Sequence, residues 1–161
     1  MCVFSTNTQL YYNEIHFMKK VIIFDLEGTL VDLGGSAFSI IFIKEATLVM
    51  LVKEYELAIV TGASREQLEY VLDNSFLGSY FKRENTITKD EVSEPKKTGL
   101  PFQYFLQRTS PQKSVIIGDS EGDRLGSEVL GIPFVQINAN LLLNDPDFMS
   151  ECIKEAVLKL K

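Results

Sequence analysis

The sequence predicts one α/β domain with three layers, in which helices cover both faces of a mostly parallel sheet. Short, continuously apolar segments alternate along the chain with segments of helical pattern. Such apolar strands are typical of sheets buried on both faces, and the helices between them supply the crossover connections. The chain has 161 residues, of which 45% are hydrophobic and 24% charged, and this suits a single domain with a substantial core.

Five strands are expected, three of them with a clear pattern. Residues 21–24, 57–60 and 114–117 are continuous apolar runs rich in β-branched side chains. Residues 133–137 are expected to form a further strand, and the more polar segment 86–88 a short one.

Helices are expected between these strands. They cover 36–55, a segment that begins after Ser64, 101–108, the segment from 120 to 130, and 151–160. Ser64 and Gln67 have the spacing of a capping box, in which each side chain bonds the other residue's backbone N–H. Pro101 suits the first turn of a helix, and Gly131 suits the position just after one.

The most apolar stretch, residues 37–52, is not expected to span a membrane. Lys44 and Glu45 interrupt it, and a lysine at the bilayer centre costs about 2.5 to 3.5 kcal/mol. The stretch is also shorter than the roughly 20 residues that a span needs. A helix packed against the sheet is the favoured interpretation.

Residues 1–17 are expected to form an N-terminal tail, and residues 18–161 the folded domain. The tail lacks the basic start and the clean apolar run of a signal peptide. Cys2 and Cys152 lie at opposite ends and form no pattern of a zinc site or a disulfide framework, which favours a reducing, cytoplasmic setting.

The charge balance argues against a broad nucleic-acid surface. The chain has 22 acidic and 16 basic residues, a net charge of -6. Proteins that neutralise many phosphates display basic faces instead.

Polar side chains follow three of the expected strands. Asp25, Thr61 and Asp119 each stand where an apolar run stops. In parallel sheets, ligands bind outside the carboxyl ends of the strands, so these side chains are expected to form one site.

Several carboxylates are expected at this edge. Asp25 and Asp119, supported by Asp123 and Glu27, would repel one another without a cation. A hard divalent ion such as Mg²⁺ resolves that repulsion where a substrate phosphate completes its ligands. The alternative for any one of these residues is a helix cap or a solvated turn.

Four segments, in this order, resemble the motifs of the haloacid dehalogenase superfamily of phosphohydrolases. Residues 25–32, Asp-Leu-Glu-Gly-Thr-Leu-Val-Asp, resemble the first motif, and residues 60–62 the second. Lys96 resembles the third motif, and residues 118–123 the fourth. The resemblance spans residues 21–137 and implies a Rossmann-like core.

The resemblance also implies a mechanism. Asp25 would attack phosphorus to form an aspartyl-phosphate, which water then hydrolyses. Mg²⁺ would be held by Asp25, the backbone carbonyl of Glu27 and Asp119. Asp123 would bind the ion through water or orient its ligands.

The second and third motifs would bind the phosphate. Thr61 would donate its hydroxyl to a phosphoryl oxygen beside the Gly62 N–H, and Lys96 would neutralise the phosphate and the nucleophile. Lys97 is an alternative to Lys96, which is preferred because its distance to Phe102 fits the family's spacing. Taken without the other motifs, Thr61 would be an ordinary residue at a strand end, and Lys96 and Lys97 would be solvated loop lysines.

Glu27 departs from the family pattern, where a second Asp serves as the acid and base. Glutamate keeps the carboxyl group, but its extra methylene displaces it, and a misplacement of about 1 Å can cost on the order of 100-fold in rate. We therefore expect a slow Mg²⁺-dependent phosphatase. The alternative is a phosphate- or partner-binding module with impaired turnover.

A phosphoacceptor domain like bacterial response regulators is a third alternative. It is disfavoured because its acceptor aspartate follows a later strand than its acidic metal ligands, whereas here the first motif opens the sheet.

The chain leaves no room for the cap domain that many family members carry. Core elements account for residues 26–60 and 62–95. An open site suits a large phosphorylated substrate, or a homo-oligomer in which one subunit covers its neighbour's site. Gly34 and Gly35 suit either a small mobile flap or a simple turn.

Overall fold

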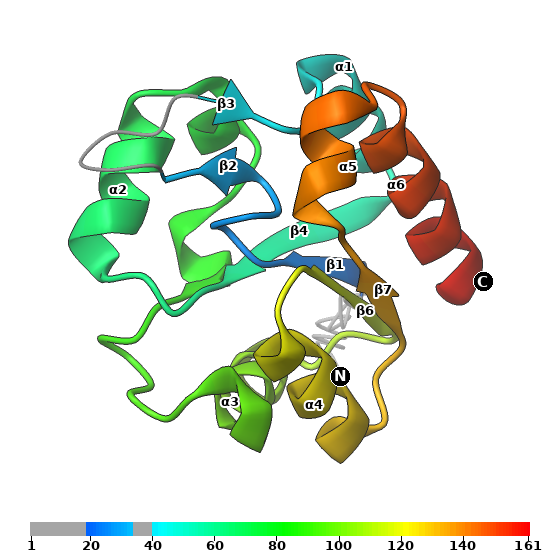
Figure 1. The fold of residues 1–161 in the computed structure, drawn as a ribbon. Coiled ribbons are helices and arrows are strands. Elements are labelled where there is room, and N and C mark those ends of the chain that lie inside the picture. Colours follow the sequence, from blue (N-terminus) through cyan, green and yellow to red (C-terminus); the bar gives the residue numbers. More distant parts are fainter. Residues whose placement is uncertain (1–18, 34–39) are drawn as a thin grey trace, which may run out of the picture.

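A parallel sheet forms the centre of the molecule (Figure 1). The computed structural model describes residues 19–33 and 40–161, and within these the sheet has five strands in the order β5-β4-β1-β6-β7. The strands are β1 (Lys20–Phe24), β4 (Tyr55–Val60), β5 (Thr86–Ile87), β6 (Ser114–Gly118) and β7 (Phe134–Gln136). Every neighbouring pair is parallel, which confirms the predicted fold class.

Helices cover both faces of this sheet (Figure 1). One face packs against α1 (Glu45–Leu51), α2 (Arg65–Asp73), α5 (Ala139–Asn144) and α6 (Phe148–Lys159), and the other against α3 (Leu100–Thr109) and α4 (Glu121–Leu130). The strand β1 serves both layers, because Ile22 and Phe24 belong to the first cluster and Val21 and Ile23 to the second. Burial on both faces explains the continuous apolar run.

Three short 3₁₀ helices complete the described chain. They are η1 (Phe76–Ser79), η2 (Arg83–Asn85) and η3 (Lys96–Thr98). Gly99 ends η3 in the left-handed conformation, with φ of 79°, and Pro101 stands in the first turn of α3. The η3 turn lies against α4 on the α3 side of the sheet.

The predicted helix over residues 36–55 is wrong. Within the described part of this stretch, β3 (Ile40–Ile41) pairs antiparallel with β2 (Val31–Asp32), and the helix is limited to α1. The β-branched side chains of β3 favour an extended strand, and pairing with β2 satisfies its backbone polar groups. The last residue of the predicted helix is the first of β4.

The other predicted elements are confirmed, with shifted ends. Ser64 and Gln67 form the predicted capping box at the start of α2. Gly131, with φ of 65°, ends α4 at the predicted position. The helix α5 was not predicted, and α6 begins at Phe148, ahead of the predicted residue 151.

No inserted cap domain occurs in the described chain. Between Asp25 and Thr61 it forms β2, β3, α1 and β4, and between Thr61 and Lys96 it forms α2, β5 and two 3₁₀ turns. The predicted tail, residues 1–17, and the turn or flap at Gly34 and Gly35 lie outside the described residues. None of the helices in residues 19–33 and 40–161 has the length and apolar character that crossing a membrane requires.

Candidate active site

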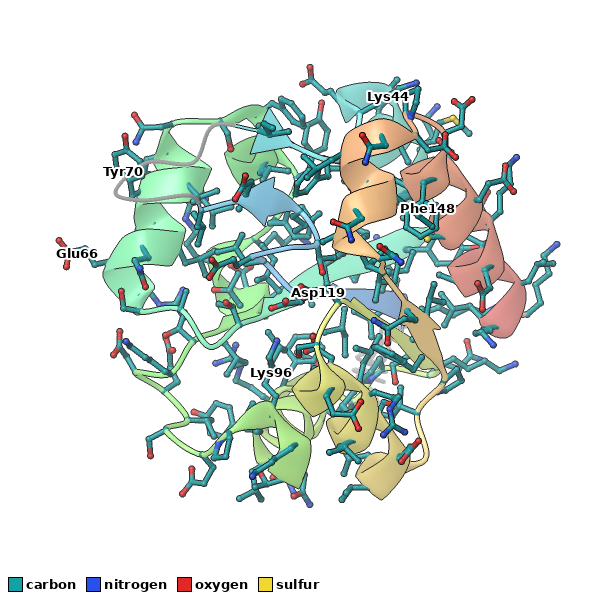
Figure 2. All side chains as sticks on the ribbon, viewed as in Figure 1. Lys44, Glu66, Tyr70, Lys96, Asp119 and Phe148 are labelled. Carbon is teal, nitrogen blue, oxygen red and sulfur yellow. The ribbon has the colours of Figure 1, made fainter. Side chains whose placement is uncertain are left out.

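The carboxyl ends of three adjacent strands carry the predicted polar residues. Thr61 follows β4, Asp25 follows β1 and Asp119 follows β6, and these strands are neighbours in the sheet. Lys96 comes from η3, and Figure 2 shows it with Asp119 in the middle of the molecule, between the sheet and α4. The topology therefore gathers residues that are far apart in sequence at one edge.

Lys96 links two of the aspartates. Its Nζ lies 2.7 Å from Asp25 Oδ1 and 2.5 Å from Asp123 Oδ1. The side chains are 13% exposed for Lys96, 8% for Asp25 and 0% for Asp123, so both ion pairs are largely removed from water. Buried pairs of this kind are screened far less than pairs on the surface.

Asp123 is also held by the start of its own helix. Its Oδ2 accepts a hydrogen bond of 2.7 Å from the Ser120 hydroxyl, and its backbone N–H donates to Ser120 Oγ over 3.1 Å. The two residues thus form a capping box at the start of α4. One carboxylate therefore caps the helix with one oxygen and meets Lys96 with the other.

Burial and neighbouring charges shift the pKa values of this group. Burial raises the pKa of Asp25 to about 6, and Asp119 adds to the rise, although Lys96 opposes it. Burial would lower the pKa of Lys96, but Asp25 and Asp123 outweigh this and raise it. Burial and Asp25 also raise the pKa of Asp123. Lys96 therefore stays a cation between carboxylates that are costly to ionise.

The aspartates have the arrangement and chemistry of a metal site. Carboxylate oxygens of Asp25, Asp119 and Asp123 all lie within 4.8 Å of one another. Three carboxylate ligands suit a hard ion such as Mg²⁺, so the donor set fits. Gly28 lies against the group, since a β-carbon on it would come within 2.2 Å of Asp119 Oδ2. The Glu27 side chain is exposed and is not one of the three clustered carboxylates.

An open pocket lies over these groups. It is lined by Asp25, Glu27, Gly28, Asp32, Thr61, Gly62, Ala63, Gln67, Lys96, Asp119 and Ser120. The structure therefore brings all the predicted site residues together, with Asp123 buried beneath the others. Lys97 is exposed and does not line the pocket, so Lys96 is the lysine that the structure places at Asp25.

Thr61 is held in a way that suits a donor. Its backbone N–H donates to the Ile87 carbonyl over 2.9 Å, and its Oγ1 accepts from the Ala63 N–H over 3.0 Å. Because Oγ1 already accepts one bond, its hydrogen is available to donate to a ligand oxygen in the pocket.

Five lining residues were not among the predicted site residues. They are Gly28, Asp32, Ala63, Gln67 and Ser120. Gly28, Asp32 and Ser120 stand within the motifs at 25–32 and 118–123, so the sequence pattern already pointed to them. Gln67 was assigned only to a helix cap, because sequence spacing does not show that the start of α2 faces the pocket.

Comparison with known proteins gives a family and several relatives. The family model described as haloacid dehalogenase-like hydrolase matches residues 43–137. That range includes Thr61, Lys96, Asp119 and Asp123, whereas Asp25 precedes it.

The similar proteins are named Pyrophosphatase PpaX. The one from Bacillus velezensis is 28% identical over 105 residues, which cover 60% of this chain and 48% of the relative. The one from Bacillus anthracis is 28% identical over 114 residues, which cover 66% of this chain and 52% of the relative. The chain thus spans about half the length of these curated relatives.

The family match covers more than half of the chain, and the parallel sheet and the acidic cluster at its edge agree with it. The chain belongs to the haloacid dehalogenase-like hydrolases.

Proposed function

We propose that this protein is a Mg²⁺-dependent phosphatase that hydrolyses a phosphomonoester through an aspartyl-phosphate on Asp25. The observation that carries the proposal is the position of the Asp25 carboxylate. It contacts the Lys96 ammonium at 2.7 Å and shares a 4.8 Å cluster with Asp119 and Asp123. The relatives are named pyrophosphatases, and that name also denotes hydrolysis at phosphorus.

Asp25, Asp119 and Asp123 would hold Mg²⁺, which supplies positive charge between the anionic nucleophile and the anionic phosphate when bound. Lys96 supplies a fixed positive charge on the other side of Asp25. Thr61 donates its hydroxyl hydrogen to a phosphoryl oxygen and so orients the phosphorus for attack.

In the first step, an oxygen of the Asp25 carboxylate attacks phosphorus. The bond between phosphorus and the leaving oxygen breaks, and Glu27 gives its proton to that oxygen, which departs as an alcohol. In the second step, Glu27 takes a proton from water as the water oxygen attacks phosphorus. The bond between phosphorus and the Asp25 oxygen breaks, which releases inorganic phosphate and restores the Asp25 carboxylate.

The ionisation of the Asp25 carboxyl group supports its role as the nucleophile. The pKa of about 6 leaves most of this carboxyl group ionised above neutrality, and added positive charge would ionise it further. Glu27 is exposed and lines the same pocket, where water and a leaving group can reach it.

Hydrolysis of p-nitrophenyl phosphate, measured with Mg²⁺ and with EDTA, tests the proposal. We expect turnover that needs the metal and that falls by at least 1,000-fold, an order-of-magnitude figure for losing a nucleophile, in Asp25→Asn. Turnover that survives either change would contradict the proposal. No turnover across a panel of phosphomonoesters, together with Mg²⁺-dependent phosphate binding, would instead favour the binding module.

A further inference from the structure

We propose that the groove between α1 and α6 is the docking site of the apolar segment that precedes β1, residues 3–17 of this chain. The groove lies at the start of the strands, whereas the candidate active site lies at their carboxyl ends, since Tyr55 begins β4 and Thr61 follows its end. The docking therefore does not depend on the proposed function.

The α1–α6 groove has an apolar lining. Its volume is about 500 Å³, and the two helices that form it lie on the same side of the sheet (Figure 1). Its apolar lining residues are Met50, Leu51, Tyr55, Ile153, Val157 and Leu158. Leu51 and Ile153 are buried, whereas Met50 is 69% exposed and Leu158 64%. Large exposed apolar side chains that gather beside an apolar groove are typical of a binding surface.

The chain enters β1 directly beside this groove. Lys20, the first residue of β1, is the register partner of Tyr55, which lines the groove. On the other side of β1, the Val21 N–H donates to the Lys113 carbonyl over 2.9 Å. Lys113 Nζ in turn donates to the Lys161 backbone carbonyl over 2.8 Å, and Lys161 also lines the groove. The start of β1 thus stands between one contact on the α1 side of the groove and one on the α6 side.

Strand geometry and length allow the segment to reach the groove. Ile22 belongs to the core layer under α1 and α6, and side chains two residues apart on a strand point to the same face, so Lys20 faces the side of the groove. The helix α6 has 12 residues, which span about 18 Å. The fifteen residues from 3 to 17 reach up to about 50 Å when extended, so they can follow the groove along all of α6.

The sequence of residues 3–17 suits an apolar groove. Its apolar and aromatic residues are Val3, Phe4, Leu10, Tyr11, Tyr12, Ile15 and Phe17. Glu14 is its one carboxylate, and it has no lysine or arginine. Packing these side chains against Met50 and Leu158 would remove apolar area of both surfaces from water, which is favourable in proportion to the area buried.

Covalent attachment favours this segment over a free partner. A segment tethered beside its binding surface is present there at an effective concentration on the order of millimolar. A second copy of the chain would have to reach that concentration to compete through equal contacts. The groove therefore fits the chain's own segment better than a second copy.

Limited digestion with chymotrypsin, which cleaves after aromatic residues, tests the docking on the full chain. Cleavage within residues 3–17 requires the segment to leave the groove, so its rate follows the population of the undocked segment. Leu158→Glu places a carboxylate in the apolar groove and should accelerate this cleavage by at least about tenfold. Mass spectrometry of the products identifies cleavage within the segment.

Val129→Glu is the matched control. Val129 and Leu158 each stand one residue before the end of their helix, and they are 65% and 64% exposed. Val129 belongs to α4, on the other face of the sheet, and does not line the groove. A substitution at such a surface position away from the groove should keep the cleavage rate within about twofold of wild type.

The methionine methyl groups report directly on the groove. Met50 lines it, whereas Met149 is buried near the start of α6 and does not. Replacing Tyr11, Tyr12 and Phe17 together by serine removes the aromatic rings of the segment and leaves every described residue unchanged. We expect this variant to shift the NMR signal of the Met50 ε-methyl group and to leave that of Met149 in place.

Three results would overturn the docking. One is an equal cleavage rate in the wild type, Leu158→Glu and Val129→Glu. Another is a Met50 signal that the three serine substitutions do not move. The third is protection from chymotrypsin that falls when the wild-type protein is diluted, because that would assign the groove to a second copy of the chain instead of its own segment.

Discussion

Gly126 of α4 lies directly against the backbone carbonyl of Lys96. A β-carbon on Gly126 would come within 2.2 Å of that oxygen and within 2.9 Å of the Phe102 ring. The absence of a side chain at Gly126 is therefore what lets η3 approach α4 closely enough for the Lys96 ammonium to reach Asp123.

Gly126→Ala should impair both folding stability and activity. The methyl group must push the η3 backbone away, and overpacking of this kind costs about 1 to 3 kcal/mol. A displacement of Lys96 by about 1 Å can lower kcat/KM by on the order of 100-fold. Urea unfolding and p-nitrophenyl phosphate hydrolysis measure the two effects.

Gly122→Ala is the control for that variant. Gly122 stands on the same helix, but a β-carbon there would meet its nearest neighbour, Ser120 Oγ, at 3.6 Å, which is an ordinary contact. We expect little change in stability or activity. Equal losses in the two variants would show that helix α4 simply does not tolerate alanine.

Lys96→Met should destabilise the metal-free protein at neutral pH. It leaves the buried carboxylates of Asp25 and Asp123 without their counter-charge, and breaking a buried pair in this way costs about 3 to 5 kcal/mol. The deficit should shrink at pH 5, because protonation removes the uncompensated charges. Lys97→Met changes an exposed side chain and should remain within about 0.5 kcal/mol of wild type. Urea unfolding in EDTA at both pH values measures these effects.

Most of the sheet could be predicted from the sequence, because strands buried on both faces have a continuous apolar pattern. The runs at 21–24, 57–60 and 114–117 became β1, β4 and β6 for that reason. The hairpin of β2 and β3 could not be predicted, since its two-residue strands have no period of their own and depend on pairing across residues 33–39. A long apolar pattern there resembled a helix instead.

The sequence predicted which residue types stand at the strand ends of the candidate site. It did not predict the contacts between them. The sequence predicted that Asp123 belongs to a metal site, whereas its simultaneous roles as cap for α4 and partner of Lys96 depend on the distance between η3 and α4. That distance is set by side-chain volume at Gly126, which no local pattern reports.

Asp25→Asn should stabilise the protein in EDTA at neutral pH. The folded-state pKa of Asp25 is about 6, above its ordinary value of 3.8. The folded state therefore binds this proton more tightly, and the stability that follows is present below the unfolded pKa and is lost as pH rises through about 6. Asparagine has no such proton to lose, so Asp25→Asn keeps this stability as the pH rises. The difference in unfolding free energy between the variant and the wild type should therefore grow between about pH 4 and 6 and then level off.

The rise in the pKa of Asp25 corresponds to a gain in unfolding free energy of about 3 kcal/mol at most for Asp25→Asn. Unfolding free energies of the metal-free proteins at several pH values would measure it. If Asp25→Asn proved less stable than wild type at pH 7, that result would contradict this assignment of the burial cost.

Glu27→Asp should raise turnover if the position of the carboxyl group limits the rate. The shorter side chain withdraws the carboxyl group by about one bond length, and a correction of about 1 Å can be worth up to on the order of 100-fold. The gain should be larger for glycerol 2-phosphate than for p-nitrophenyl phosphate, because a poor leaving group depends more on protonation by the general acid. Glu27→Gln, which keeps the size but cannot exchange a proton, should lose turnover with both substrates. If Glu27→Asp leaves kcat unchanged or lower for glycerol 2-phosphate, the longer side chain is already correctly placed and another step limits the rate.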